Sequence, residues 1–244
     1  MALFTDGALT SIEELKGHDT QLLNVATTEG IDVTRKLALA QEELSVEVSG
    51  LLARMSGAPG MGQVVVTPPL RLWHIFRTLE MVYRDAYNSQ LNDRYGGKRD
   101  EYHVMAQWAW DHVTRGGLGI VGDPVEKAAM PEVTPASGGL ADGTYYVAVA
   151  WTNAAGEEGC GSSPSVIQLS GGSFEVRTTA PPYVQGWNVY CGTGPEAMTI
   201  QNGTVLSTRE TWVAPATIST NGRQAGLGQV PTYRLPVPRT IQRG

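Results

Sequence analysis

The residues best able to bind metals or attack substrates are few and widely spaced in this sequence. They are His18, His74, His103, His112, Cys160 and Cys191. Protein zinc sites take His and Cys ligands at short fixed spacings, such as H-E-x-x-H or C-x-x-C, and neither spacing occurs. We therefore expect no metal site and no cofactor, and we expect both cysteines to be free thiols.

The motifs of nucleotide-binding and hydrolytic enzymes are missing as well. No G-x-x-x-x-G-K-[ST] loop, no G-x-G-x-x-G turn after a strand and no G-x-S-x-G element occurs. The neighbouring carboxylates Glu13/Glu14 and Glu42/Glu43 would point about 100° apart on a helix, which suits solvation better than acid–base pairing. The sequence predicts a protein that is not an enzyme and has no catalytic residue.

Composition restricts the function further. The chain has 244 residues, a hydrophobic share of 41% and a net charge of −6, which argues against a general nucleic-acid binder. The N-terminus lacks the basic and apolar stretches of a secretory signal. The longest apolar run, from Tyr145 to Trp151, is too short to span a bilayer. We expect a soluble, two-domain protein made in a reducing compartment, without a membrane partner.

Residues 1–122 carry helical patterns, and the sequence predicts a helical bundle over this range. A long helix from Asp32 has its core residues on one narrow stripe, while Leu39, Val46 and Ala53 form a second apolar row almost opposite. A helix with two apolar rows is in contact on two sides. The helix that starts at Pro68–Pro69 has Glu80 and Arg84 on its more polar side, spaced for an ion pair.

A further helix, at about 93–115, has an unusually wide apolar arc. Its apolar face is flanked by Trp108 and Trp110, which point about 200° apart. One side of a small bundle does not easily cover such an arc. Either this helix is central in the bundle, or one tryptophan contacts another chain.

After a linker at 123–128 the pattern changes to short alternating stretches. Trp187, Val189 and Cys191 alternate with polar or aromatic residues, which puts Cys191 on the core face. About seven short strands with frequent turn signals predict an immunoglobulin-like or fibronectin-like β-sandwich over 129–222.

The C-terminal segment, 223–244, contains three prolines, four arginines and no acidic residue. The prolines exclude helix and favour an extended chain. Two interpretations stay open: a disordered tail, or an arm that becomes ordered by lying along another protein.

Three stretches together resemble a known family. They are EGIDVTRKLALAQEEL (29–44), LRLWHIFRTLEMVYRDAYN (70–88) and DRYGGKRDEY (93–102). They resemble the head-to-tail adaptor (connector) proteins of tailed bacteriophages, over roughly residues 10–116. Residues 131–213 are similar to the immunoglobulin-like modules appended to many phage structural proteins, which departs from the minimal adaptor pattern.

The resemblance implies a structural protein of the virion neck, assembled in the host cytoplasm. It implies a dodecameric ring that joins the portal protein to a tail nozzle or tail-tube protein and lines part of the channel for genome ejection. DNA would pass without sequence-specific binding, which agrees with the negative net charge. Ring subunits need two different contact surfaces, for which the candidates are Leu39, Val46, Ala53, Trp108 and Trp110. The candidates for a portal-binding arm are Tyr233, Arg234, Pro236, Pro238, Arg239 and Arg243.

An alternative function concerns the β-sandwich alone. It could be a binding module on the virion surface or tail that recognises a host glycan or protein through exposed aromatics such as Tyr183 or Tyr190. A peptidoglycan-cleaving enzyme would need an isolated acidic residue in a cleft, and the sequence singles out none.

Overall fold

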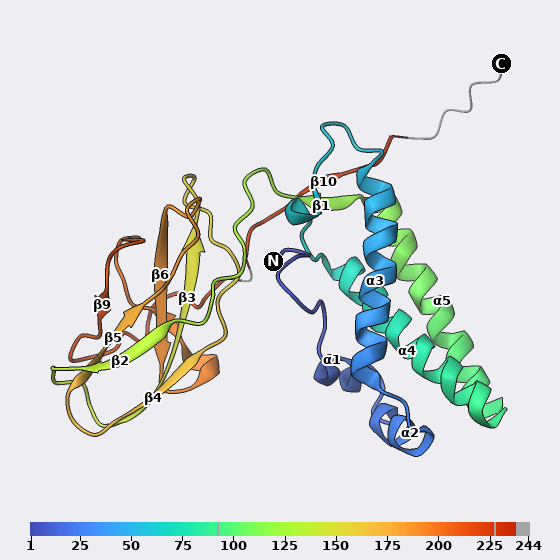
Figure 1. Cartoon of the computed structure of the whole chain (residues 1–244), viewed down its shortest axis with the longest axis horizontal. Helices are drawn as coiled ribbons and strands as arrows, with labels where there is room; N and C mark the ends of the chain where they lie inside the picture. The colour runs from blue at the N-terminus through green and yellow to red at the C-terminus, as the bar shows by residue number, and fades with distance from the viewer. Residues whose placement is uncertain (92, 227, 238–244) are drawn as a thin grey trace. The chain divides into compact units, whose positions relative to one another are not determined.

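The structure is a computed structural model that describes residues 1–91, 93–226 and 228–237 (Figure 1). Its N-terminal half is helical and is followed by antiparallel strands, which confirms the predicted fold class of a helical bundle plus a β domain. The chain divides into two compact units. The helical unit contains Gly7–Ile120 and the C-terminal residues from Thr232, and the β unit contains Met1–Asp6 and Val121–Pro231.

The α-helices described in the helical unit are α1 (Ile12–His18), α2 (Leu22–Glu29), α3 (Val33–Leu52), α4 (Pro68–Gln90) and α5 (Asp93–Gly116). A short 3₁₀ helix, η1 (Met61–Gln63), precedes α4. Capping residues and a proline determine where these helices begin. Ser11 and Glu14 form a capping box on α1, and the Asp32 side chain accepts from the amide of Arg35 at the start of α3. Pro68 occupies the first turn of α4, where its missing amide hydrogen costs nothing.

The central helix of the unit is α4. It packs against both α3 and α5, and it carries buried residues on most of its turns (Figure 1). On α5 the predicted apolar face, including Tyr102, Ala106 and Ala109, is buried, whereas Trp108 is 52% exposed. The alternative that placed this helix at the centre of the bundle is therefore wrong, because α4 occupies that position.

A buried carboxylate joins the start of the unit to its two longest helices. The hydroxyls of Tyr83 on α4 and Tyr102 on α5 donate to Asp19 Oδ2 over 2.8 and 2.7 Å, and the amide of Gln21 donates to Oδ1 over 2.9 Å. Burial raises the pKa of Asp19, but the hydrogen bonds from Tyr102, Gln21 and Tyr83 outweigh it and hold the pKa below its usual value. Asp19 is therefore ionised at neutral pH and fixes the helices to one another.

The β unit contains two antiparallel sheets. The strands of the larger sheet are β4 (Ser165–Leu169), β3 (Gly143–Thr152), β6 (Gly186–Gly192) and β7 (Thr199–Ile200), in that order, with β8 (Leu206–Ser207) also on β6. The smaller sheet has the order β2 (Glu132–Ala136), β5 (Ser173–Arg177) and β9 (Trp212–Val213). A short 3₁₀ helix, η2 (Pro195–Ala197), follows β6. One core takes side chains from both sheets, among them Val149, Phe174 and Trp187.

The two cysteines are free thiols, as expected. Cys191 is fully buried in the same core as Trp187, and burial raises its pKa to about 12. It is a structural residue with no accessible thiolate.

The β unit extends beyond its predicted boundaries on both sides. Val125 and Ala128, assigned to a linker, are 2% and 3% exposed and belong to the core. The predicted C-terminal arm was to begin at residue 223, yet the amide of Ile200 donates to the carbonyl of Arg223. Gln229 is buried and bonds to the backbone of Asp123 and Val125. Residues 123–128 and 223–231 are therefore parts of the β unit, since they fill its core and satisfy its backbone.

The chain from Thr232 onward returns to the helical unit. Strand β10 (Thr232–Arg234) pairs antiparallel with β1 (Leu118–Ile120), and the amide of Val237 donates to the carbonyl of Arg54 over 2.8 Å. Gly117 permits this approach, because a Cβ there would lie 2.6 Å from the Arg234 carbonyl oxygen. Residues 232–237 are ordered against their own chain. Both earlier interpretations, a disordered tail and an arm that becomes ordered along another protein, are therefore wrong for these residues.

Candidate functional site

A groove runs over the central helix of the helical unit, between α3 and α5. Its volume is about 380 Å³. The lining residues are Glu43, Val46 and Glu47 of α3, Trp73, Arg77 and Glu80 of α4, and His103, Ala106, Gln107 and Trp110 of α5. We call it the α3–α5 groove. It brings together two predicted interface residues, Val46 and Trp110, from helices that are far apart in the sequence.

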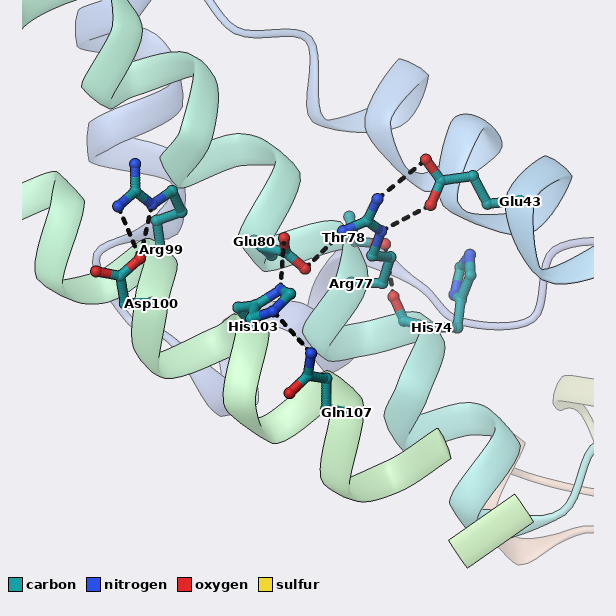
Figure 2. A network of polar contacts seen from close by, with 9 residues as sticks. All are labelled: Glu43, His74, Arg77, Thr78, Glu80, Arg99, Asp100, His103 and Gln107. Carbon is teal, nitrogen blue, oxygen red and sulfur yellow. Dashed lines mark hydrogen bonds and ion pairs between the residues drawn. The ribbon is translucent and has the colours of Figure 1, made fainter. Parts of the chain in front are cut away.

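A chain of polar contacts crosses the floor of this groove (Figure 2). Arg77 donates to both carboxylate oxygens of Glu43, over 2.7 and 3.2 Å, and to Glu80 over 2.7 Å. The other Glu80 oxygen lies 3.1 Å from Nδ1 of His103, whose Nε2 lies 2.9 Å from Nε2 of Gln107. These five residues are the Arg77 network. They connect the three helices that form the groove.

Each charged side chain of the network has a partner within it. Hydrogen bonds to Glu43 raise the pKa of the Arg77 guanidinium, which stays protonated. The Glu80 side chain is 9% exposed and has one partner on each oxygen. The predicted pairing of Glu80 with Arg84 is wrong, because Glu80 faces the groove floor and Arg84 is exposed. The network holds the helices together and leaves the apolar lining as the accessible part of the site.

The apolar lining consists of Val46, Trp73 and Trp110 (with Ala106 beside them). Val46 is 72% exposed. The rings of Trp73 and Trp110 lie with their centroids 5.9 Å apart, so Trp110 is half-buried and presents the rest of its ring to the groove. Accessible apolar side chains beside charged ones are typical of a surface that binds another polypeptide.

The other interface candidates lie outside the groove. Leu39 is half-buried on α3, and Ala53 is exposed just past the end of that helix. Trp108 contacts His112 of the same helix, with ring centroids 4.3 Å apart and the rings tilted by 47°, and Val104 one turn earlier is 63% exposed. We call Val104 and Trp108 the Trp108 surface. Since Trp108 and Trp110 point about 200° apart, this surface and the groove lie on different sides of α5.

The arm candidates fall into two groups. Tyr233 and Arg234 are exposed on β10, and Pro236 is partly exposed after it. Pro238, Arg239 and Arg243 lie outside the described residues. Sequence reasoning missed Leu235 and Val237, which are 60% and 57% exposed. Their alternation with Tyr233 is the signal that could have identified an apolar edge along the arm.

The aromatic residues suggested for a β-sandwich binding site differ in exposure. Tyr190 is fully buried, and its hydroxyl donates to Glu158 over 2.6 Å, so the prediction that it contacts a ligand is wrong. Its strand is covered on both faces, because the returning chain at Ala225 packs against it. Tyr183 is 49% exposed.

Comparisons with models of protein families and with curated proteins give no match to this chain. Within the described residues no group of three or more His, Cys, Asp or Glu side chains is placed to hold a metal ion. Among the same residues no helix has the length and apolar character needed to cross a bilayer. The α3–α5 groove, the Trp108 surface and the arm carry the exposed apolar side chains described above.

Proposed function

We propose that this chain is a structural head-to-tail adaptor of a tailed-phage virion, which forms a ring between the portal and the tail machinery. One observation carries the proposal. The helical unit exposes large apolar side chains on two different sides, at Val46 beside the half-buried Trp110 in the groove and at Val104 and Trp108 beyond it. The resemblance of residues 10–116 to adaptor proteins points to the same function.

Two separate apolar surfaces suit a subunit of a ring. Each copy in a cyclic assembly contacts its two neighbours through different surfaces, whereas a twofold dimer uses one surface twice. Covering a large apolar side chain contributes about 1.5–3 kcal/mol, so a pair of such contacts on each copy is a substantial driving force. In the proposed ring the groove of one copy contacts a neighbour on one side, and the Trp108 surface contacts the neighbour on the other.

The net charge and the exposed arm agree with a ring that lies between the portal and the tail. The net charge of −6 suits the wall of a channel through which DNA moves, since phosphates are not retained there. The exposed side chains of Tyr233, Arg234 and Leu235 offer a contact for the portal protein. Among the described strands β10 pairs only with β1, so a partner strand could pair with its other side.

The experiment is co-assembly of purified variants with the cognate portal protein, followed by sedimentation. Val46→Glu and Trp108→Glu each place a charge on one proposed contact, and we expect both to abolish the ring. Val166→Glu is the matched control, because Val166 is 58% exposed on β4 of the β unit. Circular dichroism checks that each variant is folded. Normal assembly of both helical variants would refute the proposed function.

A further inference from the structure

The β unit has a pocket of its own, with a volume of about 440 Å³. Much of its lining comes from three segments, which are residues 140–141 before β3, 192–197 from the end of β6 through η2, and 216–220 after β9. We call it the Thr217 pocket. Its volume is typical of a site for a small molecule, about 300–1,000 Å³. The lining does not include Tyr183, the exposed aromatic residue suggested above for ligand binding.

No described residue that lines the Thr217 pocket carries a charge. The α3–α5 groove, by contrast, is lined by three carboxylates and one guanidinium. A charged ligand in the Thr217 pocket would give up water without meeting an opposite charge, which costs free energy. The pocket therefore suits an uncharged ligand.

One part of the pocket lining is apolar and belongs to the sandwich core. Leu140 and Tyr145 are each 5% exposed, and Ile218 packs against the same core. The Tyr145 and Phe174 rings lie with their centroids 5.9 Å apart, and the Tyr145 hydroxyl donates to the carbonyl of Ala141 over 2.8 Å. Because both contacts hold the Tyr145 ring in place, the apolar part of the pocket is preformed.

Hydroxyl groups supply the polar part of the lining. Thr193, Thr217 and Thr220 are exposed, and their side chains make no hydrogen bond within the part of the chain that the structure describes. A hydroxyl donates one hydrogen bond and can accept two. These three side chains therefore match a ligand whose own groups both donate and accept.

The segment that carries Thr217 is held on the larger sheet. The hydroxyl of Thr199 donates to the carbonyl of Ser219 over 2.5 Å. Gln201 donates from Nε2 to the same carbonyl over 3.0 Å, and its Oε1 accepts from the Ser219 amide over 2.9 Å. Because these bonds already order the segment, a ligand loses little free energy in ordering it on binding.

We propose that the Thr217 pocket binds an uncharged sugar. A sugar ring combines apolar C–H groups with hydroxyls that donate and accept, and it carries no charge. Its C–H groups lie against Leu140, Tyr145 and Ile218, and its hydroxyls bond to the threonines. A wholly apolar ligand would cover the threonine hydroxyls without offering them a partner. This binding activity belongs to the β unit and goes beyond the proposed ring, on which it does not depend.

The test is saturation-transfer difference NMR of the full chain with glucose, galactose and mannose, each added separately. We expect transfer to at least one of them, with a dissociation constant on the order of 1 mM for a ligand of this size. The uronic acid of the sugar that binds differs from it by a carboxylate. It should bind several-fold more weakly, because no described lining residue offers it a positive charge.

Two variants locate the site. Ala216→Trp places a large side chain on the pocket lining and should weaken sugar binding at least tenfold. Thr217→Val keeps the shape of the side chain, removes one hydroxyl and should weaken binding several-fold. The matched controls are Ala154→Trp and Thr211→Val, at exposed positions of the β unit outside the pocket. Circular dichroism checks that each variant is folded.

Three results would overturn the proposal. They are no transfer to any of the three sugars, a uronic acid that binds as tightly as its parent sugar or more tightly, and equal binding by Ala216→Trp and Ala154→Trp. The first means that the pocket is not a sugar site, and the second that its uncharged lining does not select the ligand. The third means that the sugar binds elsewhere on the chain.

Discussion

Replacing Arg77 with methionine removes the guanidinium between α3 and α4 but keeps most of the aliphatic stem. Glu80 then loses its charged partner while its side chain stays 9% exposed, and removing one partner of a buried pair costs roughly 3–5 kcal/mol. The effect at Glu43 is smaller, about 0–1 kcal/mol, because that side chain is 43% exposed and water replaces the guanidinium. His103 still contacts Glu80 over 3.1 Å, which offsets part of the loss. We expect the free energy of unfolding to fall by about 3 kcal/mol.

A double variant separates the charge from the packing. Arg77→Met with Glu80→Gln removes both buried charges, and the amide of the new glutamine can still bond to His103. Because replacing a whole buried pair is close to neutral, we expect the double variant to lose about 1 kcal/mol, less than Arg77→Met alone. Urea unfolding followed by circular dichroism of the helices gives the free energies at a common m-value.

Two results would refute this reasoning. A loss below about 0.5 kcal/mol for Arg77→Met would mean that Glu80 reaches water or another partner. Strict additivity of the two substitutions would mean that Arg77 and Glu80 are not coupled. Either result would contradict the claim that the Arg77 network forms a rigid floor for the groove.

Two further predictions concern the frame of the helical unit. Asp19→Asn should destabilise the protein by about 2 kcal/mol at neutral pH, because an amide nitrogen replaces one of the two acceptor oxygens, and either the two tyrosine hydroxyls or the amide of Gln21 lose their acceptor. Since the folded pKa of Asp19 lies below the unfolded value of about 3.9, its ionised form stabilises the fold above that pH. This contribution is lost as the pH falls through the folded pKa, so the difference from wild type should shrink in acid, as urea unfolding at several pH values would test. An unchanged difference would contradict the assignment. Gly117→Ala should cost roughly 1–3 kcal/mol locally and detach β10, because the residue has a φ of 90° and its Cβ would meet the Arg234 carbonyl. Hydrogen exchange at residues 232–234 should accelerate, whereas Gly116→Ala, where a Cβ meets nothing, is the control. Equal exchange in the two variants would exclude this docking of the arm.

The helices were predictable from the sequence because their signals are local. Asp32 and Pro68 each mark a helix start within one turn of the chain. The alternation around Trp187 likewise indicated the core face of a strand. In each case the prediction depends only on the hydrophobic period or the capping residue of a single helix or strand.

The errors concern contacts between distant parts of the chain. Val125 and Gln229 lie in stretches without periodicity, yet one fills the core and the other satisfies backbone groups 104 residues away. The alternation that places Tyr190 opposite the core does not reveal that a later segment covers the second face. Contacts between residues so far apart in the sequence cannot be predicted from the pattern of one helix or strand.

The candidate site was predictable only in part. Val46 and Trp110 were each identified from an apolar position that their helix did not need for its main stripe. That they meet in one groove depends on α4 lying between α3 and α5, which no single helix encodes. Glu80 was predicted to pair with Arg84, four residues later, but it contacts Arg77, three residues earlier, and His103 of α5.

The central claim is that neighbouring copies cover the apolar surfaces of the helical unit. The most direct measurement is an electron cryomicroscopy reconstruction of the chain assembled on its portal protein. We predict a closed ring in which Val46 and Trp108 of each copy are buried against two different neighbours. An assembly in which both side chains remain in solvent, or a chain that stays monomeric beside the portal, would contradict this account.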